Sequence, residues 1–186
     1  MIKNLQVYGL ENSVRVAKFA MAADATKCTD DITERTHSLA TAQRGSGHDN
    51  FLKGIVVQFD VTFTVKAWTE AERYHWFDIV TSQSTMHKIT KFDYSDCFCD
   101  YVTNNTRAEM CRLRDLYEAE PTAENYLRLL YNCPVGIKLT AGITTNYLQL
   151  KTIYAQRRTH RLPEWVEFCK WITTLPHSEW ITREEN

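Results

Sequence analysis

The chain has 186 residues, of which 44% are hydrophobic and 24% charged, and its formal net charge is -1. These values are ordinary for one globular domain with a sizeable hydrophobic core, and the near-neutral charge argues against specific DNA binding. The sequence contains no run of about 18 apolar residues, which argues against a membrane-spanning helix, and its first residues lack the layout of a secretory signal.

Six cysteines are scattered along the chain: Cys28, Cys97, Cys99, Cys111, Cys133 and Cys169. Because the chain is too long to need disulfides and shows no export signal, we expect reduced thiols and a cytoplasmic location. One close pair, Cys97 and Cys99, has no further ligands at matching spacing. The sequence therefore predicts no metal site.

Before Gly45 the sequence predicts an edge strand and two helices. Residues 2–8, IKNLQVY, are interpreted as the edge strand, and a partly buried helix is expected to follow a cap at Asn12-Ser13. The second helix is expected to begin within residues 29–34, where acidic side chains favour a helix N-terminus, and to stop at Gly45.

Residues 45–91 are the most informative stretch. GSGHDN is a turn-forming cluster, and after it apolar residues recur at every second position, which predicts a strand with one buried face: Val57, Phe59, Val61, Phe63 and Val65. Aromatic residues in 67–80 have helical spacing, so a helix is expected there. Residues 81–91 follow as a segment dense in hydroxyl, amide and basic groups.

The second half of the chain is expected to be mainly helical. Turn residues, prolines and apolar spacing indicate four helices, at residues 107–118, 123–133, 144–158 and 164–172. Pro176 ends the last one, and residues 177–186 are expected to be a frayed tail. The sum is a single helix-rich α+β domain with few strands, spanning residues 1–186.

The common catalytic motifs are absent, since the sequence has no P-loop, GxGxxG, HExxH or GxSxG. A first candidate site is His48, which follows Gly45-Ser46-Gly47. A glycine loop exposes backbone N–H groups that suit a phosphate or the edge of a flavin ring. A simple turn before the strand explains the same residues.

Two further segments are candidates for nucleotide binding. The polar residues of the first mix an amide with cations, which suits a base and its phosphate, although a solvated loop explains them too: Gln83, Ser84, His87, Lys88 and Lys91. The second is QRRTHR at 156–161, the densest basic cluster. It suits a phosphate clamp, or equally a helix C-terminus whose dipole favours cations.

Taken together, these segments resemble the flavin-dependent thymidylate synthase (ThyX) family. LENSVRVAKFAM resembles the family's early helix, and HSLATAQRGSGHDNFLKGIVVQFDV resembles its helix, G-H-x-(S/T) loop and strand. CPVGIKLTAGITTNYLQLKTIYAQR resembles its L-P segment and N-A-R-S helix. The resemblance covers residues 5–172. It implies a small antiparallel sheet among helices and a homotetramer whose sites lie between subunits.

The resemblance also implies roles for individual residues. FAD would be held by His48, Asn50 and Asn146, where Asn50 replaces a hydroxyl residue of the family. The nucleotide would be held by Gln83, Ser84, Lys88 and Arg157, with Arg128 or Arg158 assisting at the phosphate. No catalytic side chain is named, because in such enzymes the flavin does the redox work.

The family's signature, R-H-R-x-x-S-x-N-x-x-S-x-R, is broken in this chain. Its place is taken by Trp76-Phe77-Asp78 followed by Thr81, Gln83, Met86 and Lys88. The arginines and the histidine of R-H-R are therefore all replaced. Leu148 likewise stands where the N-A-R-S motif has its arginine.

Two functions remain open from the sequence. The first is a divergent flavin-dependent one-carbon transferase acting on dUMP or another pyrimidine deoxynucleotide, with methylenetetrahydrofolate and a nicotinamide reductant as co-substrates. The second is a non-catalytic protein of the same fold that binds or sequesters a nucleotide, since the lost R-H-R removes three contacts to an anionic cofactor. The colour of the purified protein separates the two, because a flavoenzyme is yellow.

Overall fold

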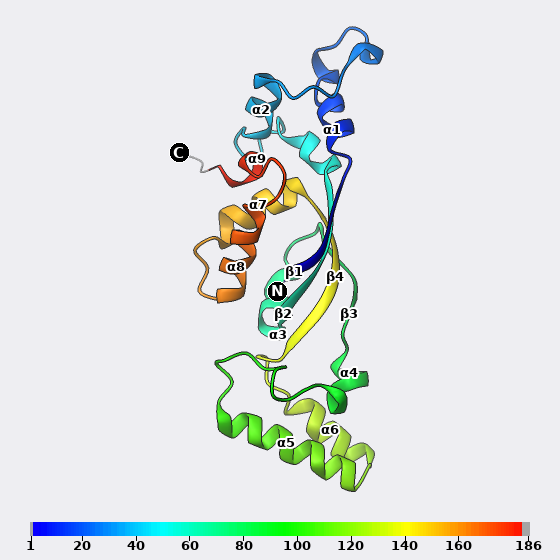
Figure 1. Cartoon of the computed structure of the whole chain (residues 1–186), viewed down its shortest axis with the longest axis vertical. Coiled ribbons are helices and arrows are strands. Elements are labelled where there is room, and N and C mark those ends of the chain that lie inside the picture. Colours follow the sequence, from blue (N-terminus) through cyan, green and yellow to red (C-terminus); the bar gives the residue numbers. More distant parts are fainter. Residues whose placement is uncertain (1, 184–186) are drawn as a thin grey trace. The chain divides into compact units, whose positions relative to one another are not determined.

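The computed structural model of the chain describes residues 2–183 (Figure 1). Its strands form one sheet with the order β1-β2-β4-β3, where the strands are β1 (Ile2–Tyr8), β2 (Val56–Thr64), β3 (Phe77–Ser82) and β4 (Lys138–Asn146). As predicted, β1 lies at a sheet edge and residues 56–64 form a strand. A helix-rich α+β fold with a small antiparallel sheet is confirmed.

The helical elements occupy most of the remaining described residues. The α-helices are α1 (Leu10–Ala17), α2 (Glu34–Ala40), α3 (Val65–Ala71), α4 (Thr85–Lys88), α5 (Asn104–Ala119), α6 (Ala123–Tyr131), α7 (Tyr147–Arg157), α8 (Pro163–Ile172) and α9 (Glu179–Thr182). Short 3-10 helices are η1 (Phe19–Met21), η2 (Ala25–Lys27), η3 (Asn50–Gly54) and η4 (Ile89–Lys91). Within residues 2–183, no helix has both the length and the apolar composition needed to cross a bilayer.

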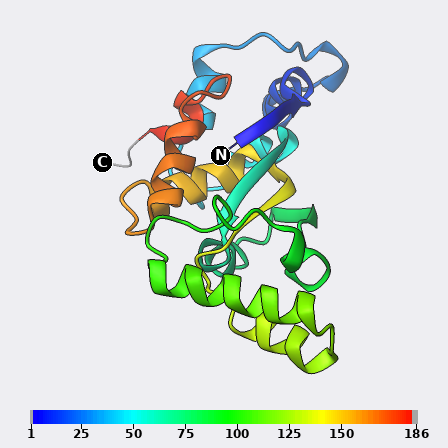
Figure 2. The same cartoon turned by 60° about the horizontal axis from the view of Figure 1, so that its bottom comes forward.

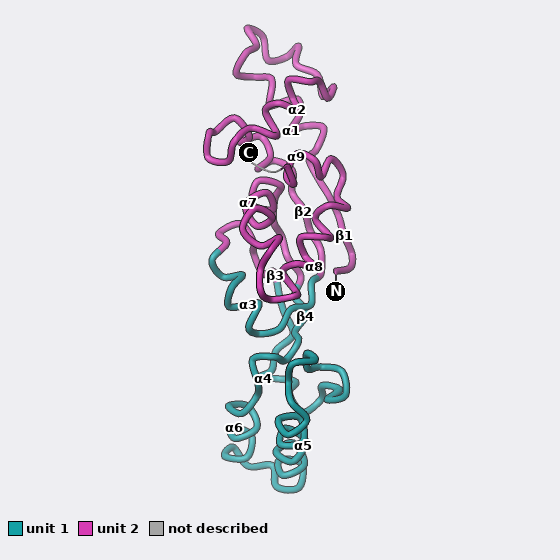
Figure 3. The backbone as a smooth tube through the Cα atoms, turned by 90° about the vertical axis from the view of Figure 1, so that its left-hand side faces the viewer, with its two compact units in different colours: residues 1, 61–73, 81–141 teal, residues 2–60, 74–80, 142–186 magenta. Residues whose placement is uncertain are grey.

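The described residues divide into two compact units (Figure 3). Unit 1 contains residues 61–73 and 81–141, and unit 2 contains residues 2–60, 74–80 and 142–183. Strands β2, β3 and β4 contribute residues to both units.

The core of unit 1 includes buried side chains of α5 and α6, two helices that lie side by side (Figure 2). Thr103 caps α5 and Thr122 caps α6, each accepting a hydrogen bond at 3.2 Å from a backbone N–H three residues ahead. The cap of α5 is thus Thr103, three residues before the expected Thr106. The buried side chains of this core are Ile89, Tyr94, Phe98, Met110, Leu113, Leu129 and Ile137.

Unit 2 has an aromatic core between β2, β3 and α8. The ring of Phe59 lies 4.6 Å from that of Trp171, and the ring of Phe77 lies 5.7 Å from that of Phe168. Helix α8 begins with Pro163 in its first turn and buries the apolar face that its spacing predicts, including Trp165. Helix α7 packs against α8, α9 and η3, so it is central to this unit.

The helix expected over residues 67–80 is wrong in its second half. Helix α3 ends at Ala71, and residues 77–82 form β3. Ile79, Val80 and Thr81 are β-branched residues that fit a pleated strand, and Phe77 is buried in the aromatic core. The aromatic residues whose spacing suggested one helix are thus spread over the region of both α3 and β3.

Strand β4 is also absent from the expectations, which placed a helix from residue 144. Ala141, Ile143 and Thr145 alternate inward along this strand, and Asn146 then begins α7. The end of α7 at Arg157 agrees with the prediction. The period-2 signal in β4 is weak because its outward residues are a glycine and threonines rather than charged side chains.

Two early helix boundaries differ from those expected. Helix α1 begins at Leu10 with Gly9 at the cap position, because the backbone of Gly9 is left-handed (φ 74°). Helix α2 begins after a capping box at Thr33 and ends at Ala40, well before Gly45.

The tail expected to be frayed from residue 177 instead contains α9. Trp180 in this helix is fully buried. It packs edge-on against Phe51 at 6.0 Å and stacks on His177 at 4.6 Å. The frayed-tail prediction is therefore wrong for residues 177–183, and residues 184–186 lie outside the described part of the chain.

Candidate functional site

Helix α7 carries the predicted flavin contact Asn146 at its N-cap. The Oδ1 atom of Asn146 accepts a hydrogen bond from the backbone N–H of Gln149 at 2.9 Å, and the residue is only 6% exposed. Its Nδ2 atom makes no hydrogen bond within the described residues. Asn146 is thus a helix cap whose amide donors remain for a ligand.

The start of α7 is fixed by its neighbours on both sides. The Thr145 hydroxyl donates to the carbonyl of Trp76 and the Tyr147 hydroxyl to the carbonyl of Pro176, both at 2.5 Å. The backbone N–H of Tyr147 donates to the carbonyl of Ile55 at 3.1 Å. Asn146 is therefore held in a well-defined place.

The predicted glycine loop presents His48 and Asn50 outward. Gly45 and Gly47 have left-handed backbones, with φ of 85° and 82°, which only glycine adopts at little cost. The Ser46 hydroxyl accepts a hydrogen bond from the backbone N–H of His48 at 3.3 Å. The side chains of His48 and Asn50 are exposed and make no hydrogen bond within residues 2–183, so both are available to a ligand.

Asp49, between these two residues, points inward to a lysine of α7. The Lys151 ammonium lies 2.7 Å from Asp49 Oδ2, and the two side chains are 8% and 2% exposed. This ion pair escaped the sequence analysis. The available signal was a lysine between the apolar residues Leu150 and Ile153, on a helix that buries both of them.

Arg157, the predicted phosphate ligand, is 7% exposed and lies within the aromatic core of unit 2. Its Nε donates to the Tyr74 hydroxyl at 2.7 Å, and its Nη1 lies 2.7 Å from His160 Nε2. The guanidinium carbon lies 5.2 Å from the ring centre of Trp165 and 5.5 Å from that of Tyr74. These contacts fix the planar group in one orientation.

Arg158, the other predicted phosphate ligand of α7, is exposed and lines a cleft of about 230 Å³. Two further arginines from distant segments line the same cleft. Arg44 donates to the carbonyl of Thr152 at 3.4 Å, and Arg183 donates to the hydroxyl of Thr41 at 3.3 Å. Arg44 and Arg183 were missed because only the fold brings them beside Arg158.

The remaining predicted nucleotide contacts belong to unit 1. Gln83 exchanges two hydrogen bonds of 2.9 Å with the backbone of Thr140, one of them through its side-chain oxygen. Ser84 precedes α4 and caps it with no side-chain bond, and Lys88 is exposed in its last turn. Arg128 pairs with Glu124 on the surface of α6. The amide oxygen of Gln83 is thus already engaged, whereas the Lys88 cation is exposed.

The residues that replace R-H-R have a structural use. Phe77 is 5% exposed and packs against Phe59 and Phe168. Trp76 is 60% exposed and Asp78 is also exposed. This start of β3 therefore contributes an aromatic core residue and a carboxylate where the signature has cations.

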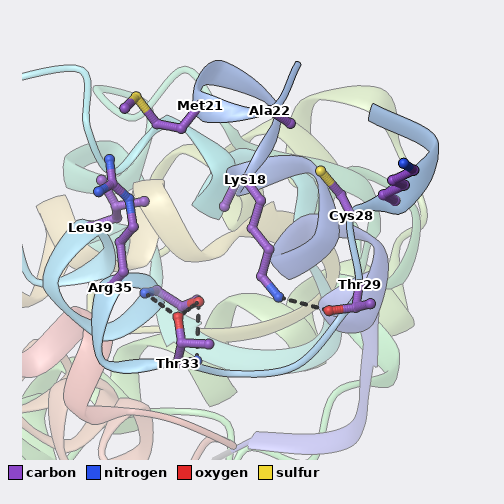
Figure 4. Close-up of a pocket in the computed structure, with 11 residues that line it drawn as sticks. Lys18, Met21, Ala22, Cys28, Thr29, Thr33, Arg35 and Leu39 are labelled. Atoms are coloured by element: carbon purple, nitrogen blue, oxygen red, sulfur yellow. Dashed lines mark hydrogen bonds between the residues drawn. The ribbon is translucent and has the colours of Figure 1, made fainter. Parts of the chain in front are cut away.

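A separate cleft of about 280 Å³ lies between α1, η2 and α2 in unit 2 (Figure 4). Lys18 crosses it and donates to the Thr29 hydroxyl at 3.1 Å, while Arg35 and Leu39 line the α2 side. None of these residues was a predicted site residue. Within the described residues, no group of three or more His, Cys, Asp or Glu side chains is placed to hold a metal ion.

No family model matches the chain, and no curated protein matches it in sequence. Solved structures do match. The flavin-dependent thymidylate synthase ThyX from Helicobacter pylori, complexed with FAD and dUMP, has a TM-score of 0.76 and 13% identity over 97% of this chain and 97% of that chain. A second structure of Helicobacter pylori ThyX with FAD and dUMP has a TM-score of 0.75 and 14% identity over 99% and 97% of the two chains.

A third similar structure is the UMP/dUMP methylase PolB from Streptomyces cacaoi, bound with 5-Br dUMP. Its TM-score is 0.61 and its identity 15%, over 92% of this chain and 89% of that chain. At these identities the likeness is one of fold. The chain has a ThyX-like fold, as the resemblance of its segments predicted.

Proposed function

We propose that this chain binds FAD and a pyrimidine deoxynucleotide and acts as a divergent flavin-dependent one-carbon transferase. The observation that carries the proposal is a fold match across 97% of both chains to a protein complexed with FAD and dUMP. The unused side-chain groups of the His48 loop and of the N-cap of α7 support the same proposal.

On the flavin side, His48, Asn50 and Asn146 are the proposed contacts. All three belong to unit 2, and η3, which begins at Asn50, packs against α7. Their uncommitted groups are an imidazole and two amides, which match the carbonyl and ring-nitrogen edge of a flavin. Bound flavin would supply the electrons of the reaction, and the protein would supply position and charge.

Each unit contains proposed nucleotide contacts of its own. In unit 2, Arg158 would hold phosphate, and the cleft that it lines brings in Arg44 and Arg183 as further cations. Arg157 is buried and bonded to Tyr74 and His160, so it would fix the end of α7 rather than contact phosphate. In unit 1, the proposed contacts are Gln83, Ser84, Lys88 and Arg128. Methylenetetrahydrofolate is the proposed one-carbon donor and a nicotinamide the proposed reductant.

A non-catalytic nucleotide-binding protein is the alternative, and the start of β3 favours it. Asp78 places a carboxylate where the family signature has an arginine, and Phe77 is committed to the core. Each lost hydrogen bond to a charged group removes about 1.5–3 kcal/mol of interaction with an anionic cofactor. A protein with this change retains its basic cleft but binds flavin weakly.

The absorbance spectrum of the purified protein tests the proposal first. Flavin bands with FAD released by heating support the enzyme, and dUMP and UMP are then tried as substrates with methylenetetrahydrofolate. The double variant His48→Ala/Asn50→Ala should lose FAD, while the exposed control Lys170→Ala should keep it. A colourless protein that also fails to bind added FAD but binds a nucleotide would establish the alternative.

We also propose a homotetramer, by resemblance to the family. Light scattering coupled to size-exclusion chromatography should then give four times the chain mass of 21.7 kDa. A mass equal to that of one chain would contradict sites built between subunits.

A further inference from the structure

We propose that Lys151 is a positioning residue that holds the His48 loop against α7. The loop meant here is residues 41–50, and "the Lys151 latch" denotes the bonds between Lys151 and residues 40, 42 and 49. The proposal rests on the proposed function only for the ligand that the loop presents. The latch itself follows from the geometry of unit 2.

Every donor of the Lys151 ammonium is used within the latch. Its Nζ donates to Asp49 Oδ2 at 2.7 Å, to the carbonyl of Ala42 at 2.6 Å and to the carbonyl of Ala40 at 3.0 Å. An ammonium has three donors, so none remains for solvent or ligand. Lys151 therefore acts through the loop and not by direct contact with a ligand.

The bonds of the latch lie on both sides of the glycine-containing part of the loop. Ala40 and Ala42 lie just before it turns, Asp49 lies at its end, and the two left-handed glycines, Gly45 and Gly47, lie between them. Glycines in such positions leave the unfixed chain many conformations. Fastening both ends to one ammonium selects a single conformation.

A second bond runs in the opposite direction. Arg44, within the loop, donates from Nη1 to the carbonyl of Thr152, the residue after Lys151. The loop and the middle of α7 are thus joined by cations from both partners. A single chance ion pair would not give this reciprocal arrangement.

The consequence for binding follows from the position of Asp49 between His48 and Asn50. Because Asp49 is buried and fixed, its two neighbours are directed to the surface, where their side chains are exposed. Loss of the latch would let the loop sample other conformations, and a ligand would then bind only the competent fraction.

The test uses variants that separate positioning from folding. Lys151→Met alone leaves a buried carboxylate without its partner and should destabilise the protein. The double variant Lys151→Met/Asp49→Leu removes both charges, and replacing a buried ion pair by apolar residues often restores stability. Lys170→Met, on an exposed pair of α8 with Glu167, is the matched control.

Two readouts are taken on the full chain. Amide hydrogen exchange of residues 41–50 should become about tenfold faster or more in the double variant, with residues 163–172 unchanged. The dissociation constant for FAD, measured by fluorescence quenching of added FAD, should rise about tenfold even though stability has returned. A role in folding alone would leave both values at the control level.

The outcomes also separate this proposal from the proposed function. If the wild-type protein binds no FAD, the flavin assignment fails, and hydrogen exchange still tests the latch. If the double variant exchanges at the wild-type rate in residues 41–50, the latch is overturned whether or not FAD binds. If exchange accelerates while FAD affinity stays at the control value, Lys151 orders the loop but does not position flavin contacts, which also overturns the proposal.

Discussion

Arg157 donates from Nε to the hydroxyl of Tyr74 at 2.7 Å, across 83 positions of the sequence. Tyr74 in turn donates from that hydroxyl to the amide oxygen of Gln156 at 3.1 Å. Tyr74 and Arg157 are each 7% exposed, and the ring of Trp165 lies 5.9 Å from that of Tyr74. A basic segment that looks like a surface clamp in the sequence is thus partly built into the core of unit 2.

We expect Tyr74→Phe to destabilise the protein by about 1–3 kcal/mol, because the charged Nε donor of Arg157 would lose a buried acceptor. The measurement is the free energy of unfolding from urea titration. Tyr131→Phe is the control, since Tyr131 is 82% exposed, and it should change stability by less than about 0.5 kcal/mol. Equal effects of the two substitutions would show that the Arg157–Tyr74 bond contributes nothing.

Substitutions at Asn146 should separate its capping role from ligand binding. Asn146→Ala removes the Oδ1 acceptor and should cost about 1 kcal/mol of stability. Asn146→Asp keeps an acceptor at the N-terminus of α7 and should retain wild-type stability. Both variants lose the Nδ2 donor, so both should bind FAD more weakly. An Asn146→Asp protein with unchanged FAD affinity would remove Asn146 from the flavin contacts.

Tyr94 in unit 1 offers a test of a buried hydroxyl. Its oxygen is buried and has no hydrogen-bond partner among residues 2–183, and burial raises the pKa of this phenol above its usual range. Folding removes this hydroxyl from water without giving it a hydrogen bond in return. The free energy of unfolding of Tyr94→Phe should therefore equal that of the wild type or exceed it by up to about 1 kcal/mol.

Tyr147→Phe is the matched opposite of Tyr94→Phe. The Tyr147 hydroxyl donates to the carbonyl of Pro176 at 2.5 Å, so its removal should cost about 1 kcal/mol. Thermal unfolding of the two variants should therefore move the melting temperature in different directions, or leave it unchanged for Tyr94→Phe. A clear loss of stability in Tyr94→Phe would mean that the hydroxyl has a partner, such as an ordered water.

Stability should fall at alkaline pH because of the buried thiol of Cys169. Burial raises the pKa of Cys169 from 9.0 to about 12, while the positive charge of Arg157 acts the other way. The folded state therefore keeps the thiol protonated where the unfolded state ionises. The stabilising contribution is complete below pH 9.0 and is lost as pH rises toward about 12.

Unfolding free energies at pH 7, 9 and 10.5 measure this dependence. Between pH 9 and 10.5, Cys169 alone should contribute a decline of roughly 1 kcal/mol per pH unit, because the unfolded thiol is about half ionised at pH 9 and almost fully ionised at pH 10.5. Burial also raises the pKa of Cys97 and of Cys133 to about 11, so both add to the decline. In Cys169→Ala the unfolding free energy should decline less steeply with pH than in the wild type. Equal slopes for the two proteins would contradict the contribution assigned to Cys169.

Much of the fold follows from local signals in the sequence. The alternation of Val57, Phe59, Val61 and Phe63 determines β2, since only a strand puts all four on one buried face. Pro163 at the start of α8 and Thr122 before α6 mark helix starts through geometry that their own side chains provide. Such signals depend on neighbours in the chain and survive without knowledge of the fold.

Local signals in the sequence did not predict strands β3 and β4 or the true bounds of the helices beside them. Residues 74–80 carry aromatic spacing that fits a helix, and only the pairing of β3 beside β4 gives Phe77 its place in the core. Strand pairing is a long-range interaction, which local propensity does not encode. The same reason explains the unexpected burial of Trp180 in α9.

For the candidate site, the sequence by itself determined which residue types are present: the glycine loop with His48, the asparagine that begins α7 and the basic segment after it. The tertiary structure decided what each of them can do. It turned Asn146 into a cap with spare donors, placed Arg157 among aromatic rings and brought Arg44 and Arg183 beside Arg158. Only the tertiary structure showed the ion pair between Asp49 and Lys151. A buried ion pair depends on which distant segments meet in the interior, and no local sequence pattern specifies that.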